Sequence, residues 1–160
     1  GQSVRKVAAA AGVAVPEGTK VIMLRAKGPG RADILCKEKM FPVLITLPYD
    51  DFEEAIAIAR ENLLYEGAGH TASIHSLDTE HIKRAGDSLP ISRLVVNQPS
   101  STGAGGNIHN GFSPTTTLGC GSWGNNSISE NLGFEHMINI SRLGMYNKAA
   151  RMPAPAEIWQ

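Results

Sequence analysis

Short apolar runs alternate with helical patterns along the first 97 residues of this chain, and this alternation most constrains its fold. The segments expected to form strands are 21–24, 42–47, 71–75 and 93–97, and those expected to form helices are 3–11, about 51–65 and 79–85. The runs at 21–24 and 42–47 are of the buried type, which indicates strands covered on both faces. Helices placed between successive strands are typical of parallel sheets. The sequence therefore predicts an α/β fold built on a parallel sheet.

The helix in the middle of this region carries signals at both of its ends. Asp50 is expected to cap it, and Glu53, three residues later, completes a capping-box-like pair. Apolar side chains recur every three or four residues and give the helix one buried face. Gly67 follows the last turn, as glycine commonly does after a helix.

Length, charge and cysteine content exclude several classes of protein. The 160 residues fit one domain or one lobe of a larger one. Lys plus Arg number 15, as do Asp plus Glu, so the formal net charge is zero. This balance argues against nucleic acid and against a polybasic membrane surface. No apolar run is long enough to span a membrane, and a start at Gly1 without a signal-peptide layout suggests a fragment or a processed chain.

The two cysteines, Cys36 and Cys120, lie far apart. They indicate a reducing compartment rather than a disulfide framework, and neither has metal-ligand spacing, so no metal site is predicted. Cys36 follows two apolar residues, a setting that disfavours a reactive thiolate. Cys120 lies between two glycines and is the better placed of the two.

Residues 98–133 break the pattern with a long stretch of Gly, Ser, Thr and Asn. A stretch of this length is usually functional or disordered, and the large apolar residues threaded through it favour an ordered loop. Residues 119–124 match the letters of the dinucleotide fingerprint G-x-G-x-x-G. The fingerprint also needs a following helix and an acidic residue about 20 positions on, and both are missing.

Two residues outside this loop carry candidate chemistry. His70 opens a predicted strand after a glycine-rich turn, and histidine is a residue type suited to accept and return a proton near neutral pH. The alternative is a structural histidine bonded to backbone at a strand edge. Glu38 offers an acceptor-only carboxylate that can bind two hydroxyls. The alternative is a solvated residue between Lys37 and Lys39.

Three segments resemble the CoA-acylating aldehyde dehydrogenases. They are Lys-Glu-Lys-Met-x-Pro-Val from residue 37, Gly-x-Gly-His-Thr-x-x-Ile from residue 67, and Thr-Leu-Gly-Cys-Gly-Ser-Trp-Gly-x-Asn-Ser-x-Ser-Glu-Asn from residue 117. The resemblance implies the three-layer, parallel-sheet catalytic lobe of that fold. Residues 1–134 would form its C-terminal part, and residues 135–160 an oligomerisation strand, at 136–142, and a tail.

The same resemblance implies roles for particular residues. Glu38 and Met40 would bind the nicotinamide ribose of NAD or NADP, and His70 would perform acid–base work near the nucleophile. The loop residues Gly119, Cys120, Gly121, Ser122 and Trp123 would line the acyl pocket. The family's nucleophilic cysteine lies in a motif that this chain lacks.

The implied reaction converts an aldehyde, CoA and NAD(P)⁺ into acyl-CoA and NAD(P)H through a cysteine thioester. The chain alone is expected to be inactive, with the remaining N-terminal lobe, the small aldehyde, CoA and further copies of itself as partners. A cytoplasmic location, with a bacterial microcompartment as a variant, follows from the same resemblance. Acetaldehyde, sulfoacetaldehyde and succinate semialdehyde all remain open as substrates. Two alternatives stand beside this hypothesis: a non-catalytic oligomerising fragment, and a hydrolytic aldehyde dehydrogenase that uses water in place of CoA.

Overall fold

The computed structural model describes residues 1–158 and confirms the predicted alternation of strands and helices. The elements are α1 (Val4–Ala10), β1 (Ile22–Arg25), β2 (Val43–Thr46), α2 (Phe52–Tyr65), β3 (Gly69–Ile74), α3 (Thr79–Ser88), β4 (Ile91–Val96), α4 (Ser100–Gly103) and α5 (Pro155–Ile158). Short 3-10 helices occur at Gly30–Ala32 (η1), Ile34–Cys36 (η2), Ser122–Gly124 (η3) and Phe134–Met137 (η4). Each predicted helix and strand in the first 97 residues is present, with ends shifted by at most three residues.

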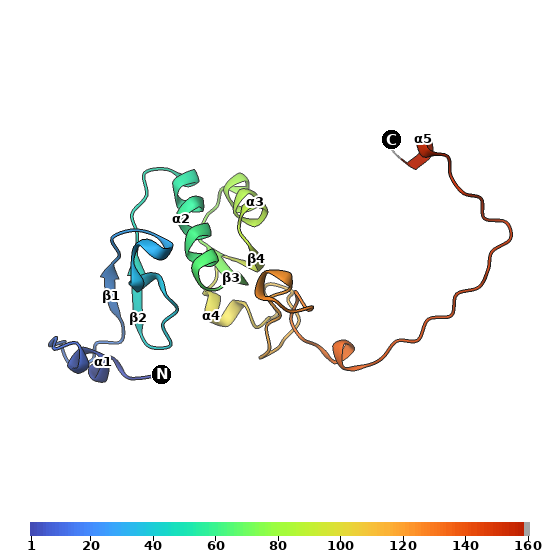
Figure 1. The fold of residues 1–160 in the computed structure, drawn as a ribbon. Helices are drawn as coiled ribbons and strands as arrows, with labels where there is room; N and C mark the ends of the chain where they lie inside the picture. The colour runs from blue at the N-terminus through green and yellow to red at the C-terminus, as the bar shows by residue number, and fades with distance from the viewer. Residues whose placement is uncertain (159–160) are drawn as a thin grey trace.

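All strand pairs within the described elements are parallel, but they form two separate pairs. β1 pairs with β2, with Ile22 opposite Val43, and β3 pairs with β4, with Thr71 opposite Arg93. Helix α2 contacts both η1 and α3, and Figure 1 shows it between the β1–β2 pair and α3. The parallel α/β prediction is therefore confirmed, although no hydrogen-bonded strand in residues 1–158 joins the two pairs.

The β1–β2 pair is less covered than its apolar sequence suggests. Met23 is 65% exposed and Leu44, its partner across the ladder, is 56% exposed. The prediction that these strands are covered on both faces is wrong for the chain by itself. Side chains alternate between the two faces of a strand, and the side chains of this pair are largely open to solvent.

Helix α2 begins one residue later than the predicted cap requires. Asp51, not Asp50, is the N-cap, and its Oδ1 accepts a hydrogen bond from the backbone N–H of Glu54 at 2.9 Å. Glu54 in turn accepts from the N–H of Asp50 at 2.6 Å. Glu53 instead binds Arg84 of α3 through two hydrogen bonds of 2.6 and 2.9 Å. The sequence holds the same D-x-x-E spacing in both registers, so spacing alone does not choose between them.

Backbone and asparagine hydrogen bonds organise the loop at residues 98–133. The N–H of Gly119 donates to the carbonyl of Glu130 at 3.0 Å, and the N–H of Gly121 donates to the carbonyl of Ile128 at 2.8 Å. The buried amide of Asn131 donates to two further backbone carbonyls, those of Ala104 at 3.0 Å and Ser113 at 2.7 Å. These bonds satisfy backbone groups that no sheet or helix accommodates.

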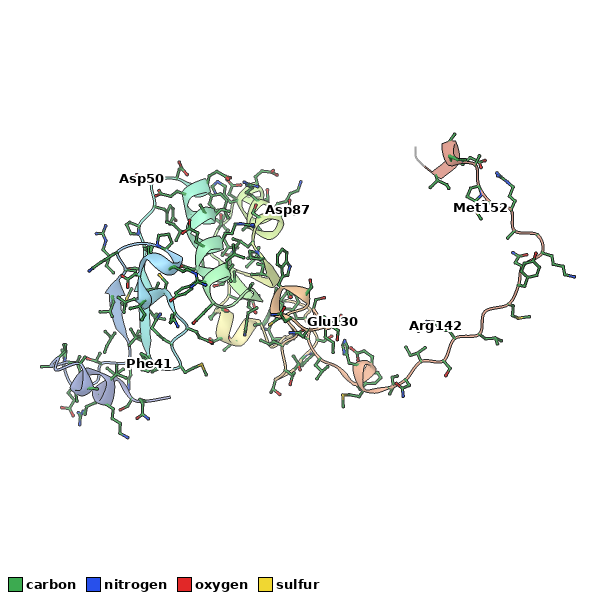
Figure 2. The ribbon with its side chains drawn as sticks, viewed as in Figure 1. Phe41, Asp50, Asp87, Glu130, Arg142 and Met152 are labelled. Carbon is green, nitrogen blue, oxygen red and sulfur yellow. The ribbon has the colours of Figure 1, made fainter. Side chains whose placement is uncertain are left out.

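The C-terminal residues differ from the predicted strand. Residues 134–137 form η4, and residues 138–154 run away from the folded part without strand pairing (Figure 1). Figure 2 shows Arg142 and Met152 on this arm, apart from the rest of the molecule. A strand needs a hydrogen-bonding neighbour, and residues 1–158 offer none to this segment. The strand between subunits at 136–142 and the division at residue 134 therefore stay predictions. Within residues 1–158, no helix combines the length and the apolar character needed to cross a membrane.

Candidate functional site

Glu38 and His70, which sequence patterns single out separately, line the same cleft. The cleft measures about 460 Å³ and lies where the turn after η2, the C-terminal half of α2 and the start of β3 meet. Its lining residues are Cys36, Glu38, Lys39, Ile45, Asn62, Leu63, Glu66, Gly67, His70, Thr71 and Ser100. The fold thus brings the predicted cofactor residue and the predicted acid–base residue to one place.

The backbone at Glu38 is held in position while its carboxylate stays free. Its N–H donates to Oε2 of Glu66 at 2.5 Å, and Oε1 of Glu66 lies 3.5 Å from Nζ of Lys37. Nζ of Lys39 donates to the carbonyl of Lys37 at 2.6 Å rather than pairing with Glu38. No hydrogen bond or ion pair from residues 1–158 reaches the Glu38 carboxylate. Met40 is 72% exposed and does not line the cleft.

His70 is fixed by its neighbour Thr71 and by a buried arginine. Its Nδ1 lies 3.0 Å from Oγ1 of Thr71, which also accepts a hydrogen bond from Nε of Arg93 at 3.2 Å. Nη2 of Arg93 donates to the carbonyl of His70 at 3.4 Å. Arg93 is only 4% exposed. The ring of His70 is thus bonded to a hydroxyl, not to backbone as in the alternative interpretation.

Sequence reasoning missed both Thr71 and Arg93. Thr71 belongs to the quoted Gly-His-Thr segment, and Arg93 is the single charged residue in the otherwise apolar or small-residue strand β4. A lone arginine inside such a strand was the signal available, because an isolated charge is costly to bury.

The glycine-rich loop packs directly on the residue before His70. Gly69 has φ +83°, and a Cβ placed on it would collide with the carbonyl oxygen of Cys120 and lie 2.9 Å from Cβ of Trp123. Oδ1 of Asn126 accepts from the N–H groups of Cys120 at 3.2 Å and Gly121 at 2.9 Å, which closes the turn. The loop therefore lies against the His70 end of β3.

The predicted loop residues do not themselves line the cleft of Glu38 and His70. Gly119 lines a separate hollow of about 270 Å³ with Leu118, Asn126, Ser127 and others. The other four predicted loop residues line neither space, and Trp123 among them is 56% exposed; they are Cys120, Gly121, Ser122 and Trp123.

Neither cysteine has the surroundings of an activated nucleophile. The thiol of Cys36 is buried and donates to the carbonyl of Gly28 at 3.3 Å. The thiol of Cys120 is half-buried, and its one hydrogen-bond partner in residues 1–158 is the carbonyl of Leu118, at 3.8 Å. No group of three potential metal ligands occurs in the part of the chain that the structure describes.

Comparison with known proteins gives the class first. The fold superposes with a TM-score of 0.84 on a probable aldehyde dehydrogenase from Listeria monocytogenes EGD-e, which is 35% identical, and covers 99% of this chain and 34% of that one. It superposes with a TM-score of 0.82 on an acetylating aldehyde dehydrogenase from Geobacillus thermoglucosidasius, which is 31% identical, and covers 96% of this chain and 33% of that one. No protein-family model matches the chain. The aldehyde dehydrogenase fold is therefore established.

A relative of higher sequence identity indicates which kind of aldehyde dehydrogenase this chain resembles. The chain is 65% identical, over 159 residues, to the succinate-semialdehyde dehydrogenase (acetylating) of Clostridium kluyveri, a match that covers 99% of this chain and 35% of the relative. Along nearly its whole length the chain is therefore similar to acylating aldehyde dehydrogenases, and it spans about a third of the length of the relatives it matches. The resemblance drawn from the three sequence segments is confirmed.

Proposed function

We propose that this chain forms part of the catalytic lobe of an enzyme that converts an aldehyde, CoA and NAD(P)⁺ into acyl-CoA and NAD(P)H. The observation that carries the proposal is the shared cleft of Glu38 and His70. One contributes a free carboxylate and the other a titratable imidazole, and both come from the segments that match the acylating family.

Glu38 suits the binding of a nicotinamide cofactor. Its carboxylate has no partner among residues 1–158, and its backbone is anchored by Glu66, so it can accept from two ribose hydroxyls without first breaking an internal bond. The nicotinamide, when bound, supplies the hydride acceptor. Met40, on the exposed side of the same turn, would contribute apolar contact when the cofactor covers it.

His70 is placed to act on the thioester step of the same reaction. His70 is exposed at the start of β3 and lines the cleft, and its ring is oriented by the hydrogen bond with Thr71. The loop at residues 119–123, seated on Gly69, would then close the acyl pocket beside it, with Trp123 as its large apolar surface. The thioester-forming cysteine is supplied by a part of the enzyme that this chain does not include.

The bare face of β1 and β2 supports a larger lobe. Met23 and Leu44 are exposed on a strand pair whose sequence is of the buried type. Covering such a face contributes about 25 cal/mol per Å² of apolar area removed from water. We propose that the remaining lobe of the enzyme covers it.

A chimaeric enzyme tests the proposal. This chain replaces the corresponding third of the Clostridium kluyveri relative, with which it is 65% identical. The expected result is NAD(P)H formation that depends on both CoA and an aldehyde. Succinate semialdehyde is the first substrate to try, because the relative's name states it, and acetaldehyde and sulfoacetaldehyde follow. A folded chimaera without activity, beside an active unmodified relative, contradicts the proposal.

A second candidate function, assembly, rests on the C-terminal arm. Ile138 and Ile140 are 56% and 61% exposed, and Leu143 is 89% exposed, on a segment that pairs with no strand in residues 1–158. Exposed apolar residues on an extended segment favour pairing with a second subunit. Sedimentation of the chimaera with and without residues 138–158 tests this role separately from catalysis.

The hydrolytic alternative is less favoured, because the relatives named above include acetylating enzymes. Omitting CoA from the assay separates the two: a hydrolytic enzyme would form NAD(P)H at the same rate without it. The cytoplasmic or microcompartment location stays a prediction.

A further inference from the structure

The hydroxyl of Thr71 lies between two nitrogens of different character. Nε of Arg93 is 3.2 Å from Thr71 Oγ1 on one side, and Nδ1 of His70 is 3.0 Å away on the other. A guanidinium can only donate hydrogen bonds, because it has no acceptor atom and does not lose its proton in proteins. The Thr71 oxygen must therefore accept from Arg93.

Within residues 1–158, the hydroxyl proton of Thr71 has one protein acceptor, Nδ1 of His70. Among residues 1–158, the only hydrogen-bond partners of Oγ1 are Arg93 and His70. Arg93 cannot receive the proton, whereas a bare imidazole nitrogen can. A bond from the Thr71 hydroxyl to Nδ1 of His70 is the arrangement that pairs both the oxygen and the proton of this hydroxyl within the protein.

We propose that Arg93, acting through Thr71, holds neutral His70 in the tautomer that carries its proton on Nε2. Nε2 is then a hydrogen-bond donor, and Nδ1, which lies beside Thr71, is the acceptor. Arg93 and Thr71 are positioning residues for His70.

The fold makes this arrangement rigid. Thr71 and Arg93 are paired positions in the parallel β3–β4 ladder, so their side chains project from the same face. Arg93 is 4% exposed and anchors the carbonyl of His70 through Nη2 at 3.4 Å. No carboxylate in residues 1–158 forms an ion pair with it, and its Nη1 has no partner there. A neutral amide at this position could turn and present its oxygen, but a guanidinium cannot.

The consequence for catalysis rests on the proposed function. In this tautomer, neutral His70 cannot take the thiol proton of CoA at Nε2, because that nitrogen already carries one. CoA would react as the fraction of thiolate already formed in water, with the thiol proton released to solvent. Its sulfur bonds to the thioester carbon, and the carbonyl electron pair moves to oxygen. Collapse of this adduct expels the cysteine as thiolate. Nε2–H of His70 would donate to the oxygen while it is charged, a contribution worth about 10²–10³-fold in rate for one such donor.

Nitrogen NMR of the ¹⁵N-histidine-labelled chain tests the tautomer without any activity. Spectra are taken at about pH 8, where an ordinary imidazole is neutral, and a His70→Gln sample identifies the His70 signals among the five histidines. The expected result is an unprotonated Nδ1 and a protonated Nε2. Thr71→Val, which keeps the shape and removes the hydroxyl, should shift the ring toward a mixture of tautomers, and Thr71→Ser should restore the wild-type pattern. An unprotonated Nε2 in the wild type, or no change in Thr71→Val with the fold intact, overturns the inference.

The pH dependence of thioester capture by the chimaera provides a second, kinetic test. If Nε2–H is a donor, the slower thioester capture of His70→Ala should persist as the pH rises through the range in which CoA ionises. Full relief of the defect at high pH would mean that His70 is the base for the thiol, and the inference would be wrong. Failure of the proposed function looks different: the chimaera would show no CoA-dependent turnover, while the NMR result would stand.

Discussion

Replacing Gly69 with alanine should separate the glycine-rich loop from the strand that carries His70. Gly69 has φ +83°, and its added Cβ would strike the backbone of Cys120 and approach Cβ of Trp123 to 2.9 Å. Backbone atoms cannot swing aside as the end of a long side chain can. The loop must move, or β3 must.

Gly18 provides a matched control for the backbone part of this cost. Its φ is +82°, and a Cβ placed there meets nothing within 4 Å. A positive φ costs a non-glycine residue about 1–2 kcal/mol, and the stiffer unfolded chain returns about 0.4–1 kcal/mol. Gly18→Ala should therefore destabilise by about 0–1.5 kcal/mol. Gly69→Ala carries the same cost plus about 1–3 kcal/mol for the forced displacement.

Urea unfolding followed by circular dichroism gives the difference between the two variants directly. Fluorescence of Trp123, in a background with the second tryptophan replaced by phenylalanine, reports whether the loop itself has moved. We expect Gly69→Ala to be the less stable of the two by about 1–3 kcal/mol, with altered Trp123 emission in the folded state. Equal stabilities and unchanged emission would refute the close packing of the loop on Gly69.

Four further outcomes test other parts of the molecule. In the chimaera, Glu38→Gln should raise the KM for NAD(P)⁺ and slow hydride transfer, with a loss of about 1–3 kcal/mol in cofactor interaction. If neither the KM nor the hydride-transfer rate changes, Glu38 does not bind the cofactor. Asn131→Leu should destabilise the chain by about 1–3 kcal/mol, because the buried carbonyl of Ala104 loses its donor, and urea unfolding measures it. The hydrogen bond that the Glu130 carboxylate accepts from Nε2 of His136 raises the pKa of His136. The stability it contributes is therefore full below the unfolded pKa and lost as the pH rises through the folded one. Glu130→Gln should flatten that part of the pH–stability curve. The chain alone should form no NAD(P)H from aldehyde and CoA, and activity abolished by Cys120→Ser would make that thiol the nucleophile.

The order of helices and strands could be predicted from the sequence because the periodicities that encode it are local. Helix α2 shows this, with apolar residues at helical spacing and acidic residues at its start. Even there, the cap is Asp51 rather than Asp50, and Glu53 binds Arg84 of α3 in a contact between helices that no local pattern reports. The candidate residues Glu38 and His70 were also found from the sequence, through residue chemistry and the segments that resemble the acylating family.

Only the tertiary structure decided which of these residues meet. The cleft of Glu38 and His70 forms because α2 carries the chain from one strand pair to the other, and no local pattern reports that distance. The pairing of Thr71 with Arg93 follows from the register of two parallel strands joined through α3. Register is set by which faces are buried across the whole sheet. The sequence therefore shows that a strand contains Arg93. Only the fold decides that this arginine binds the hydroxyl of Thr71, and that the hydroxyl in turn contacts His70.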